Sequence, residues 1–318
     1  MLYLKAGDEM KKIFSTVFNI ILFVGIIYAV FNFDKITNFI VDLQENFQYD
    51  MDLKNLKMPT QSTYNLKYSH NYVKENKINI PNNTTDIKNI IYTILNNGWS
   101  TFDYLCPKEY KNCIDDSLSI TNNNVILSDI NNFVHPYNSF SLLETAYTNN
   151  GKFTINIKKN YTNDDINIIE QKVNEIIKAY IKDSMSDREK IKTIHDYIIN
   201  NTKYDNKYIE KTSNYKSNIA YGALIEGNAI CSGYTDAMAI FLNKFNIPNY
   251  KISSSTHIWN LVYIDGDWKH LDLTFDDPVS NTNANLLEYD YFLITTNQLY
   301  KLDKDEHTFN EKVFSEAN

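Results

Sequence analysis

The chain has 318 residues, of which 43% are hydrophobic and 14% aromatic, so it can bury at least one large core. Glycine and proline are scarce, at 8 and 6 residues, which excludes collagen-like and proline-rich disordered chains. The formal net charge is −8 and lysine and arginine form no stripe, so no basic surface for phosphates is present. We therefore expect no nucleic-acid partner.

Residues 13–33 are uncharged and mostly apolar, which is long enough for a helix to cross a bilayer core of about 30 Å. Three lysines precede this stretch and one follows closely, so residues 1–12 are expected to be a cytoplasmic tail. A cleaved signal peptide would need a small-x-small cleavage site, and residues 28–32 do not supply one. The sequence predicts a single-pass membrane protein whose body is extracytoplasmic.

Residues 34–83 are polar and rich in Asn, Lys and Tyr, which is typical of a stalk or linker. Only the spacing of Ile36, Phe39, Ile40 and Leu43 favours a helix that continues beyond the membrane.

A folded region is expected to begin near residue 84, and residues 84–160 are predicted to be a small α+β unit. One of the two threonines that open it can cap an apolar-striped helix, which Gly98 ends. The runs Ser139–Tyr147 and Lys152–Lys158 flank a turn-forming segment and indicate a hairpin.

Residues 161–318 are predicted to be a second folded domain. Its first helix runs from about Asn163 to Ile181 and has one apolar stripe. The next helix opens with Ser186-Asp187-Arg188-Glu189, a capping box.

The three cysteines do not have equivalent surroundings. Cys106 and Cys113 are close enough in sequence to pair outside the cell, although the sequence alone does not decide this. Cys231 is then the odd thiol, at or just before the start of an amphipathic helix that Pro248 closes. The helix dipole and free backbone N–H groups there favour a thiolate and can hold a developing oxyanion. A buried structural cysteine is the alternative.

Downstream, two strand-like runs surround Asp265-Gly266, a strong two-residue hairpin turn. If that turn forms the loop, His257 lies opposite Thr274, and Asp272 lies two places along on the same face. A loop one residue longer or shorter would put His257 and Asp272 on opposite faces. The predicted register therefore brings an imidazole and a carboxylate together.

Cys231, His257 and Asp272 supply the three groups that cysteine catalysis needs. The imidazole takes the thiol proton and returns it to the leaving amine, while the carboxylate fixes the imidazole tautomer. A sheet-edge histidine and a turn aspartate without a catalytic role are the alternative. The three residues lack the short Cys-x-x-Cys or His-x-x-x-His spacing of a zinc site, so we expect no metal and no cofactor.

Three motifs give these residues a family context. Gly227-Asn228-Ala229-Ile230-Cys231-Ser232-Gly233-Tyr234 resembles the G-x-x-x-C-x-G-Y nucleophile motif of the transglutaminase-like family. His257-Ile258-Trp259-Asn260 resembles its histidine strand, and the segment from Asp272 to Pro278 resembles its aspartate strand and following loop. The motifs occur in family order, and the resemblance covers roughly residues 165–300.

Four further features bear on the resemblance. His195-Asp196-Tyr197 and Tyr204-Asp205 also resemble family sequences. Thr235 stands where the family usually has Ala, and Phe275 where it often has Trp. Neither departure removes a catalytic atom.

The resemblance implies an α+β, papain-like core with the nucleophile helix packed on an antiparallel sheet. It implies a thioester acyl-enzyme formed from a carboxamide or peptide carbonyl of a protein or peptide substrate at the cell surface. Tyr221 is a candidate for the oxyanion hole, and Trp259 for a wall of the substrate groove. A papain-like endopeptidase and a non-catalytic surface module that keeps the fold remain alternatives.

Overall fold

The computed structural model describes residues 2–278 and 287–317. The chain divides into two compact units. One contains Met1–Leu56 and Thr148–Lys152, and the other contains Lys57–Tyr147 and Phe153–Asn318.

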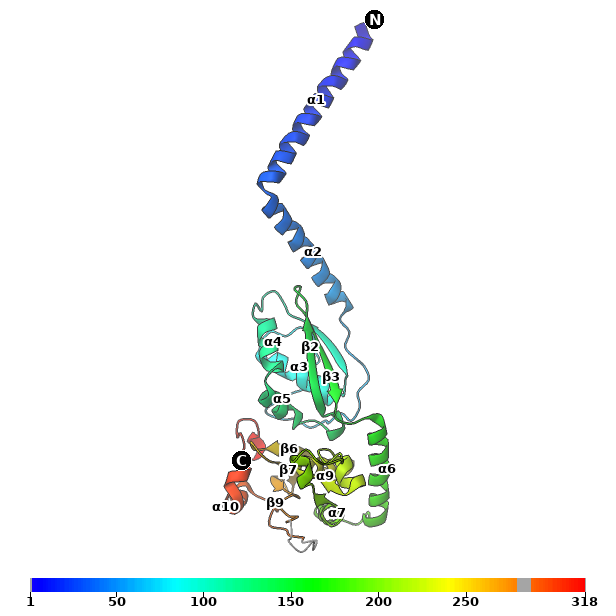
Figure 1. Ribbon diagram of the computed structural model, residues 1–318, viewed down its shortest axis with the longest axis vertical. Helices are drawn as coiled ribbons and strands as arrows, with labels where there is room; N and C mark the ends of the chain where they lie inside the picture. Colours follow the sequence, from blue (N-terminus) through cyan, green and yellow to red (C-terminus); the bar gives the residue numbers. More distant parts are fainter. Residues whose placement is uncertain (1, 279–286, 318) are drawn as a thin grey trace. The chain divides into compact units, whose positions relative to one another are not determined.

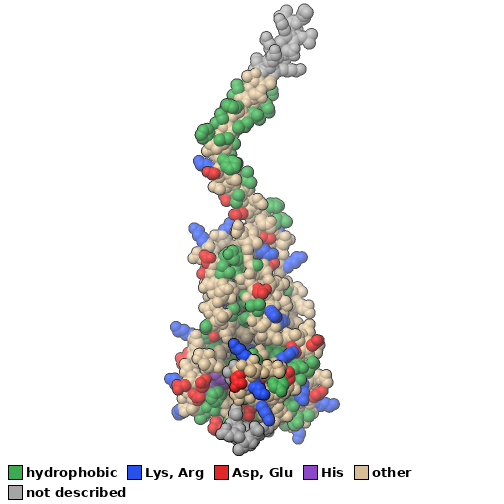
Figure 2. All heavy atoms as spheres, viewed as in Figure 1, with side chains coloured by type: hydrophobic (Ala, Val, Ile, Leu, Met, Phe, Trp, Pro, Cys, Tyr) green, Lys and Arg blue, Asp and Glu red, His purple; other side chains and the backbone are tan. Residues whose placement is uncertain are grey.

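The first unit consists mainly of two helices, α1 (Leu2–Phe31) and α2 (Phe33–Asn55). Within α1, the segment Phe14–Phe31 is long and apolar enough for a membrane span or a signal sequence, and none of it is buried. In Figure 2 hydrophobic side chains cover much of the visible face of these helices. The helical continuation predicted through Ile36 and Leu43 is confirmed, since both lie within α2.

The second unit begins with a three-stranded sheet in the order β1-β3-β2 and three helices, all labelled in Figure 1 except β1. Its elements are α3 (Thr84–Asn96), β1 (Thr101–Leu105), α4 (Cys113–Thr121), α5 (Asn124–Asn131), the 3-10 turn Pro136–Asn138, β2 (Phe140–Tyr147) and β3 (Lys152–Lys159). The predicted hairpin is confirmed as the antiparallel pair β2–β3. Asn83 caps α3, rather than a threonine, because its side chain accepts the backbone N–H of Asp86 at 2.9 Å.

Cys106 and Cys113 form a disulfide, which leaves Cys231 as the free cysteine.

The second part of this unit carries the helices and short strands around Cys231. They are α6 (Asn163–Tyr180), α7 (Asp187–Asn201), β4 (Lys203–Tyr204), α8 (Asn206–Ile209), the π-helical turn Gly222–Glu226, β5 (Asn228–Ala229) and α9 (Cys231–Lys244). The predicted capping box of α7 is present, since Ser186 and Glu189 bond each other's backbone N–H groups. Strands β4 and β5 pair in parallel, and β5 ends shortly before Cys231.

A four-stranded antiparallel sheet in the order β6-β7-β8-β9 completes this unit. Its strands are β6 (Asn249–Ser253), β7 (Ile258–Ile264), β8 (Asp267–Leu271) and β9 (Phe292–Ile294). The helix α10 (Thr296–His307) and the 3-10 turn Ser315–Ala317 follow them. Ile264 pairs with Asp267 across the tight turn, so the predicted register is confirmed. Both turn residues have positive φ, 55° at Asp265 and 83° at Gly266, which suits a two-residue hairpin loop.

The two faces of this sheet bury two different cores. Val262 and Leu271 pack with α6, α7 and α9 on one face. Trp259 and Leu261 pack on the other face with the residues of the three-stranded sheet and its helices. The α+β class, with the helix that begins at Cys231 packed on an antiparallel sheet, is therefore confirmed. Residues 84–160 share a core with β6 and β7, and the segment 57–83, predicted as part of a stalk, adds Val73 to it.

Candidate active site

Cys231 is the first residue of α9, and its side chain is half-buried. The first backbone N–H groups of a helix have no intrahelical acceptor, so those of Cys231 and Ser232 can donate to an incoming oxygen. Gly233 allows this helix start to pack closely, because a Cβ there would lie 2.4 Å from the carbonyl oxygen of Ser217. The glycine of the nucleophile motif is thus required by packing.

His257 lies immediately before β7 and is 8% exposed. Its Nε2 is 2.5 Å from Oδ2 of Asp272, and the ring lines the same cavity as Cys231. Since Asp272 occupies Nε2, the nitrogen that remains for the sulfur is Nδ1. Burial alone would lower the pKa of His257, but the charge and hydrogen bond of Asp272, helped by Cys231, raise it to about 10.

Asp272 follows β8 and is 1% exposed. Its Oδ1 accepts the backbone N–H groups of Thr274 and Phe275, at 2.9 and 3.3 Å, which fixes the carboxylate plane. Burial would raise its pKa, but two neighbouring histidines hold that pKa well below its usual range. Asp272 therefore stays ionised beside the ring that it orients.

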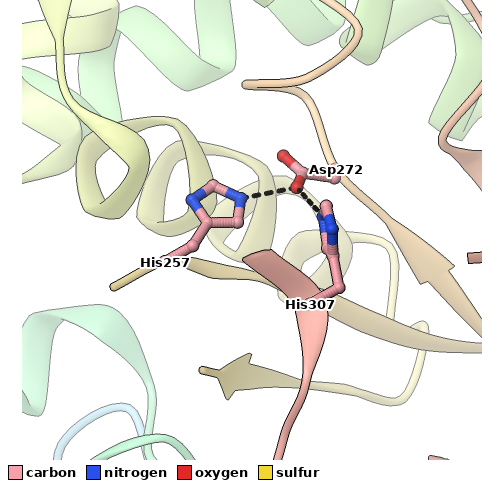
Figure 3. A group of neighbouring side chains, drawn as sticks. All are labelled: His257, Asp272 and His307. Atoms are coloured by element: carbon pink, nitrogen blue, oxygen red, sulfur yellow. Dashed lines mark hydrogen bonds and ion pairs between the residues drawn. The ribbon is translucent and has the colours of Figure 1, made fainter. Parts of the chain in front are cut away.

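The second of these histidines, His307, was not predicted as part of the site. It ends α10, is fully buried, and places its Nε2 3.0 Å from the same Oδ2 of Asp272. Figure 3 shows Asp272 between the rings of His257 and His307, with one contact to each. No spacing rule in the sequence connects His307 to Asp272, because the contact depends on how α10 packs on the sheet.

A cavity of about 400 Å³ opens beside the thiol. Its lining residues are Tyr204, Asn206, Cys231, Thr256, His257, Thr274, Phe275, Asp277, Pro278 and Glu306. Burial and the neighbouring charges of Cys231 and Asp272 raise the pKa of Tyr204, so its hydroxyl stays protonated as a donor. The thiol and the imidazole therefore both face a space that a substrate can enter.

Asp277 is an acid in this lining with an unusual environment. The hydroxyl of Tyr234 donates to its Oδ2 at 2.5 Å. Burial outweighs that hydrogen bond and the charge of His195, and raises the pKa of Asp277 to about 6.

The two secondary candidates lie elsewhere. Tyr221 does not line the cavity, and the Lys216 ammonium lies 4.7 Å from its ring centre. Trp259 is 1% exposed, stacks on His257 with ring centres 5.6 Å apart, and donates its Nε1–H to His270. Trp259 thus packs against the imidazole and does not line the cavity, whereas the aromatic residues Tyr204 and Phe275 do.

The ligand atoms of His257, Asp272 and His307 lie within 4.8 Å of one another, a spacing that a metal site also shows. Both Nε2 atoms already bond Oδ2 of Asp272, and a metal ion would have to replace the protons of both contacts. The cluster fits a hydrogen-bonded carboxylate better than a metal centre.

Residues 174–273 match the model of the transglutaminase-like superfamily. This segment is therefore similar to the transglutaminase-like superfamily. The segment contains Cys231, His257 and Asp272, and the resemblance inferred from the three motifs is confirmed for it. His307 lies beyond the matched segment.

Two solved structures are similar to the chain at low identity. One is described as a TGase, with 17% identity, a TM-score of 0.32, and coverage of 46% of this chain and 48% of that one. The other is described as a "putative cysteine protease" from Cytophaga hutchinsonii, with 15% identity, a TM-score of 0.27, and coverage of 42% and 61%. The chain therefore spans about half of one structure and less than two thirds of the other. No curated protein matches the sequence.

Proposed function

We propose that the transglutaminase-like domain is a cysteine-dependent acyltransferase, with Cys231 as nucleophile, His257 as general acid and base, and Asp272 as the residue that orients the imidazole. One observation carries this proposal: a free thiol at a helix start faces a cavity beside an imidazole whose Nε2 is held 2.5 Å from a buried carboxylate. The high pKa of His257 favours an imidazolium at neutral pH, which stabilises a neighbouring thiolate.

The reaction proceeds in two halves. The Cys231 sulfur attacks the carbonyl carbon of a carboxamide or peptide, and the oxyanion accepts hydrogen bonds from the N–H groups at the start of α9. The proton on Nδ1 of His257 then passes to the leaving nitrogen as the C–N bond breaks, which releases ammonia or an amine and leaves a thioester. Water or a second amine gives a proton to His257 and resolves the thioester by hydrolysis or by forming an amide.

Tyr204 takes the place in this scheme that the sequence assigned to Tyr221. Its protonated hydroxyl lines the cavity, and the charge of Cys231 acts on it. It is the side chain best placed to add a third donor to the oxyanion.

The apolar segment Phe14–Phe31 supports a membrane-anchored location. With the lysines before it on the cytoplasmic side, the catalytic domain faces out of the cell and acts on cell-envelope or extracellular proteins. Labelling of Cys231 in intact cells by a membrane-impermeant maleimide tests this orientation, and labelling only after lysis would contradict it.

Selective alkylation tests whether Cys231 is present as a reactive thiolate. Iodoacetamide should modify Cys231 near neutral pH, while Cys106 and Cys113 stay silent in their disulfide. His257→Ala should slow the modification at least tenfold, since it removes the proton acceptor. Equal rates in both proteins would favour a non-catalytic module that merely keeps the fold.

Product analysis separates the remaining alternatives. A glutamine-rich protein is incubated with the full chain, with and without a primary amine, and the products are read by mass spectrometry. Amine incorporation or deamidation that Cys231→Ser abolishes supports acyl transfer at side-chain carboxamides. Backbone cleavage alone would assign the domain to the endopeptidases.

A further inference from the structure

Two acidic side chains line the cavity beside Cys231. Glu306 lies in the last turn of α10, and Asp277 lies in the loop after β8. Each is held by a hydroxyl: Thr256 donates to Oε2 of Glu306 at 2.8 Å, and Tyr234 donates to Oδ2 of Asp277 at 2.5 Å. The other oxygen of each carboxyl group has no hydrogen-bond partner among the described residues. Both groups therefore keep an oxygen with which they can act on a molecule in the cavity.

No positive charge in the described lining offsets these two acids. His257 is the cationic residue of the lining, and its charge is matched by Asp272, whose Oδ2 lies 2.5 Å from Nε2. No lysine or arginine belongs to the lining that the structure describes. Lys207 and Lys304 are close in sequence to lining residues, but neither lines the cavity, and the Lys304 ammonium lies 5.4 Å from the ring centre of Tyr300.

Both acids are ionised at pH 8. Glu306 is exposed, and an exposed glutamate is a carboxylate at that pH. Burial outweighs the hydrogen bond of Tyr234 and the charge of His195 and raises the pKa of Asp277 to about 6, which still leaves it ionised at pH 8. A sphere with the volume of this cavity is roughly 9 Å across, similar to the Debye length at physiological salt, so dissolved ions screen the two charges only in part.

We propose that Glu306 and Asp277 are specificity-determining residues, which make the cavity favour acyl donors with a positive charge beside the reacting carbonyl and disfavour donors with a negative charge there. The inference rests on the proposed function of Cys231 and names the substrate class of that site. Each carboxylate attracts the cationic donor and repels the anionic one, so it contributes twice to the difference between the two substrates.

Two thiol reagents of opposite charge test this preference. Cys231 is modified in the full chain, in detergent at pH 8 and low ionic strength, with trimethylammonium-ethyl methanethiosulfonate, a cation, or sulfonatoethyl methanethiosulfonate, an anion. In both reactions the thiolate forms a mixed disulfide and releases methanesulfinate. The ratio of the cationic to the anionic rate is divided by the same ratio for 2-mercaptoethanol. We expect this normalised ratio to be at least about ten in the wild type.

Charge-removing variants assign the preference to the two residues. Glu306→Gln and Asp277→Asn each keep an oxygen that can accept the hydroxyl of Thr256 or Tyr234. Each should lower the normalised ratio about threefold, and the double variant should lower it about tenfold. Glu311→Gln is the matched control, because Glu311 is exposed and does not line this cavity. Its normalised ratio should stay within about 1.5-fold of the wild-type value.

Turnover of peptides extends the test from the reagents to the reaction. The value of kcat/KM should be at least about tenfold higher for a peptide with Lys beside the reacting Gln than for one with Glu, and the double variant should lose most of this preference. A wild-type normalised ratio near one, or a ratio that the double variant leaves unchanged, would overturn the inference. The ratio requires only a modifiable Cys231. Alkylation that does not depend on His257 would instead refute the proposed function, so the two failures are distinguishable.

Discussion

The region from α7 to the loop after β8 contains two buried histidine–aspartate pairs that look alike by contact alone. In one, Nε2 of His257 lies 2.5 Å from Asp272, and in the other, Nε2 of His195 lies 3.0 Å from Asp276. All four side chains are almost fully buried. In both pairs burial would lower the histidine pKa, and the acidic partners outweigh burial and raise it.

The pairs differ in what the other ring nitrogen contacts. Nδ1 of His195 lies 3.0 Å from Oδ1 of Asp196, whose Oδ2 in turn accepts the Lys192 ammonium at 2.6 Å. Both ring nitrogens of His195 thus contact acidic side chains, so neither is free to exchange a proton with a substrate or a thiol. The second nitrogen of His257 has no acidic partner among the described residues, and the ring lines a cavity together with Cys231. A histidine–aspartate contact becomes a candidate site only when one nitrogen stays available to a nucleophile.

The same substitution in both pairs tests this difference most strongly. Asp272→Asn should lower the rate of acyl transfer by about 10³- to 10⁴-fold, because an amide no longer fixes the productive tautomer of His257. Asp276→Asn should lower it less than tenfold in protein that remains folded. Single-turnover rates of both variants, with circular dichroism to confirm folding, provide the comparison. Equal losses would mean that the two pairs act as one catalytic unit.

The pH dependence of stability should also separate the pairs. The pKa of His257 rises from 6.5 to about 10 on folding, so its contribution is fully present below pH 6.5 and is lost as the pH rises through 10. The loss amounts to roughly 5 kcal/mol of unfolding free energy. The unfolding free energies of wild type and His257→Gln, measured by urea titration at pH 6, 8 and 10, should therefore approach each other as the pH rises. The difference in unfolding free energy between wild type and His195→Gln should also decrease as the pH rises. A difference that increases with pH would contradict a raised histidine pKa in the folded protein.

Removing the contact between His195 and Asp276 should mainly lower the unfolding free energy. Asp276→Ala leaves a buried imidazolium with one acid instead of two, and we expect a loss of about 3 kcal/mol in unfolding free energy. Asp196→Ala removes the more exposed partner, 27% accessible, and should cost about 1 kcal/mol or less. Denaturant midpoints measure both. A smaller loss of unfolding free energy for Asp276→Ala than for Asp196→Ala would mean that Asp196, and not the buried Asp276, is the more important partner of His195.

The sequence predicted the first pair and missed the second for a physical reason. His257 and Asp272 lie on one hairpin, whose Asp265-Gly266 turn sets the register, so local rules sufficed. His195 and Asp276 come from a helix and a loop 81 residues apart, and their contact depends on tertiary packing.

The same limit explains His307, Tyr204 and Trp259. His307 reaches Asp272 only because α10 packs on the sheet. Tyr204 borders the thiol because β4 pairs in parallel with β5, a non-local contact. Trp259 was expected to form a groove wall, but its face of β7 is covered by the core shared with the three-stranded sheet, which alternation within one strand cannot show.

The smallest expected effect concerns Thr235, whose hydroxyl helps to hold Cys231 near His257. Its Oγ1 lies 2.8 Å from the carbonyl oxygen of Cys231 and 3.0 Å from that of Ile258, so one hydroxyl joins the start of α9 to the start of β7. Thr235→Ala, which restores the residue usual in the family, should lower unfolding free energy by about 1 kcal/mol, the net value of one such bond. Thr235→Ser keeps the hydroxyl and should lose less.

The rate of Cys231 alkylation decides whether this hydroxyl also sets the geometry of the site. The backbone of α9 is held by its close packing at Gly233 as well, so the rate should change less than threefold in Thr235→Ala. A larger fall in Thr235→Ala that Thr235→Ser restores would show that the distance between sulfur and imidazole depends on this single bond. In that case the difference between the two histidine–aspartate pairs would rest on the placement of α9 as much as on the free nitrogen of His257.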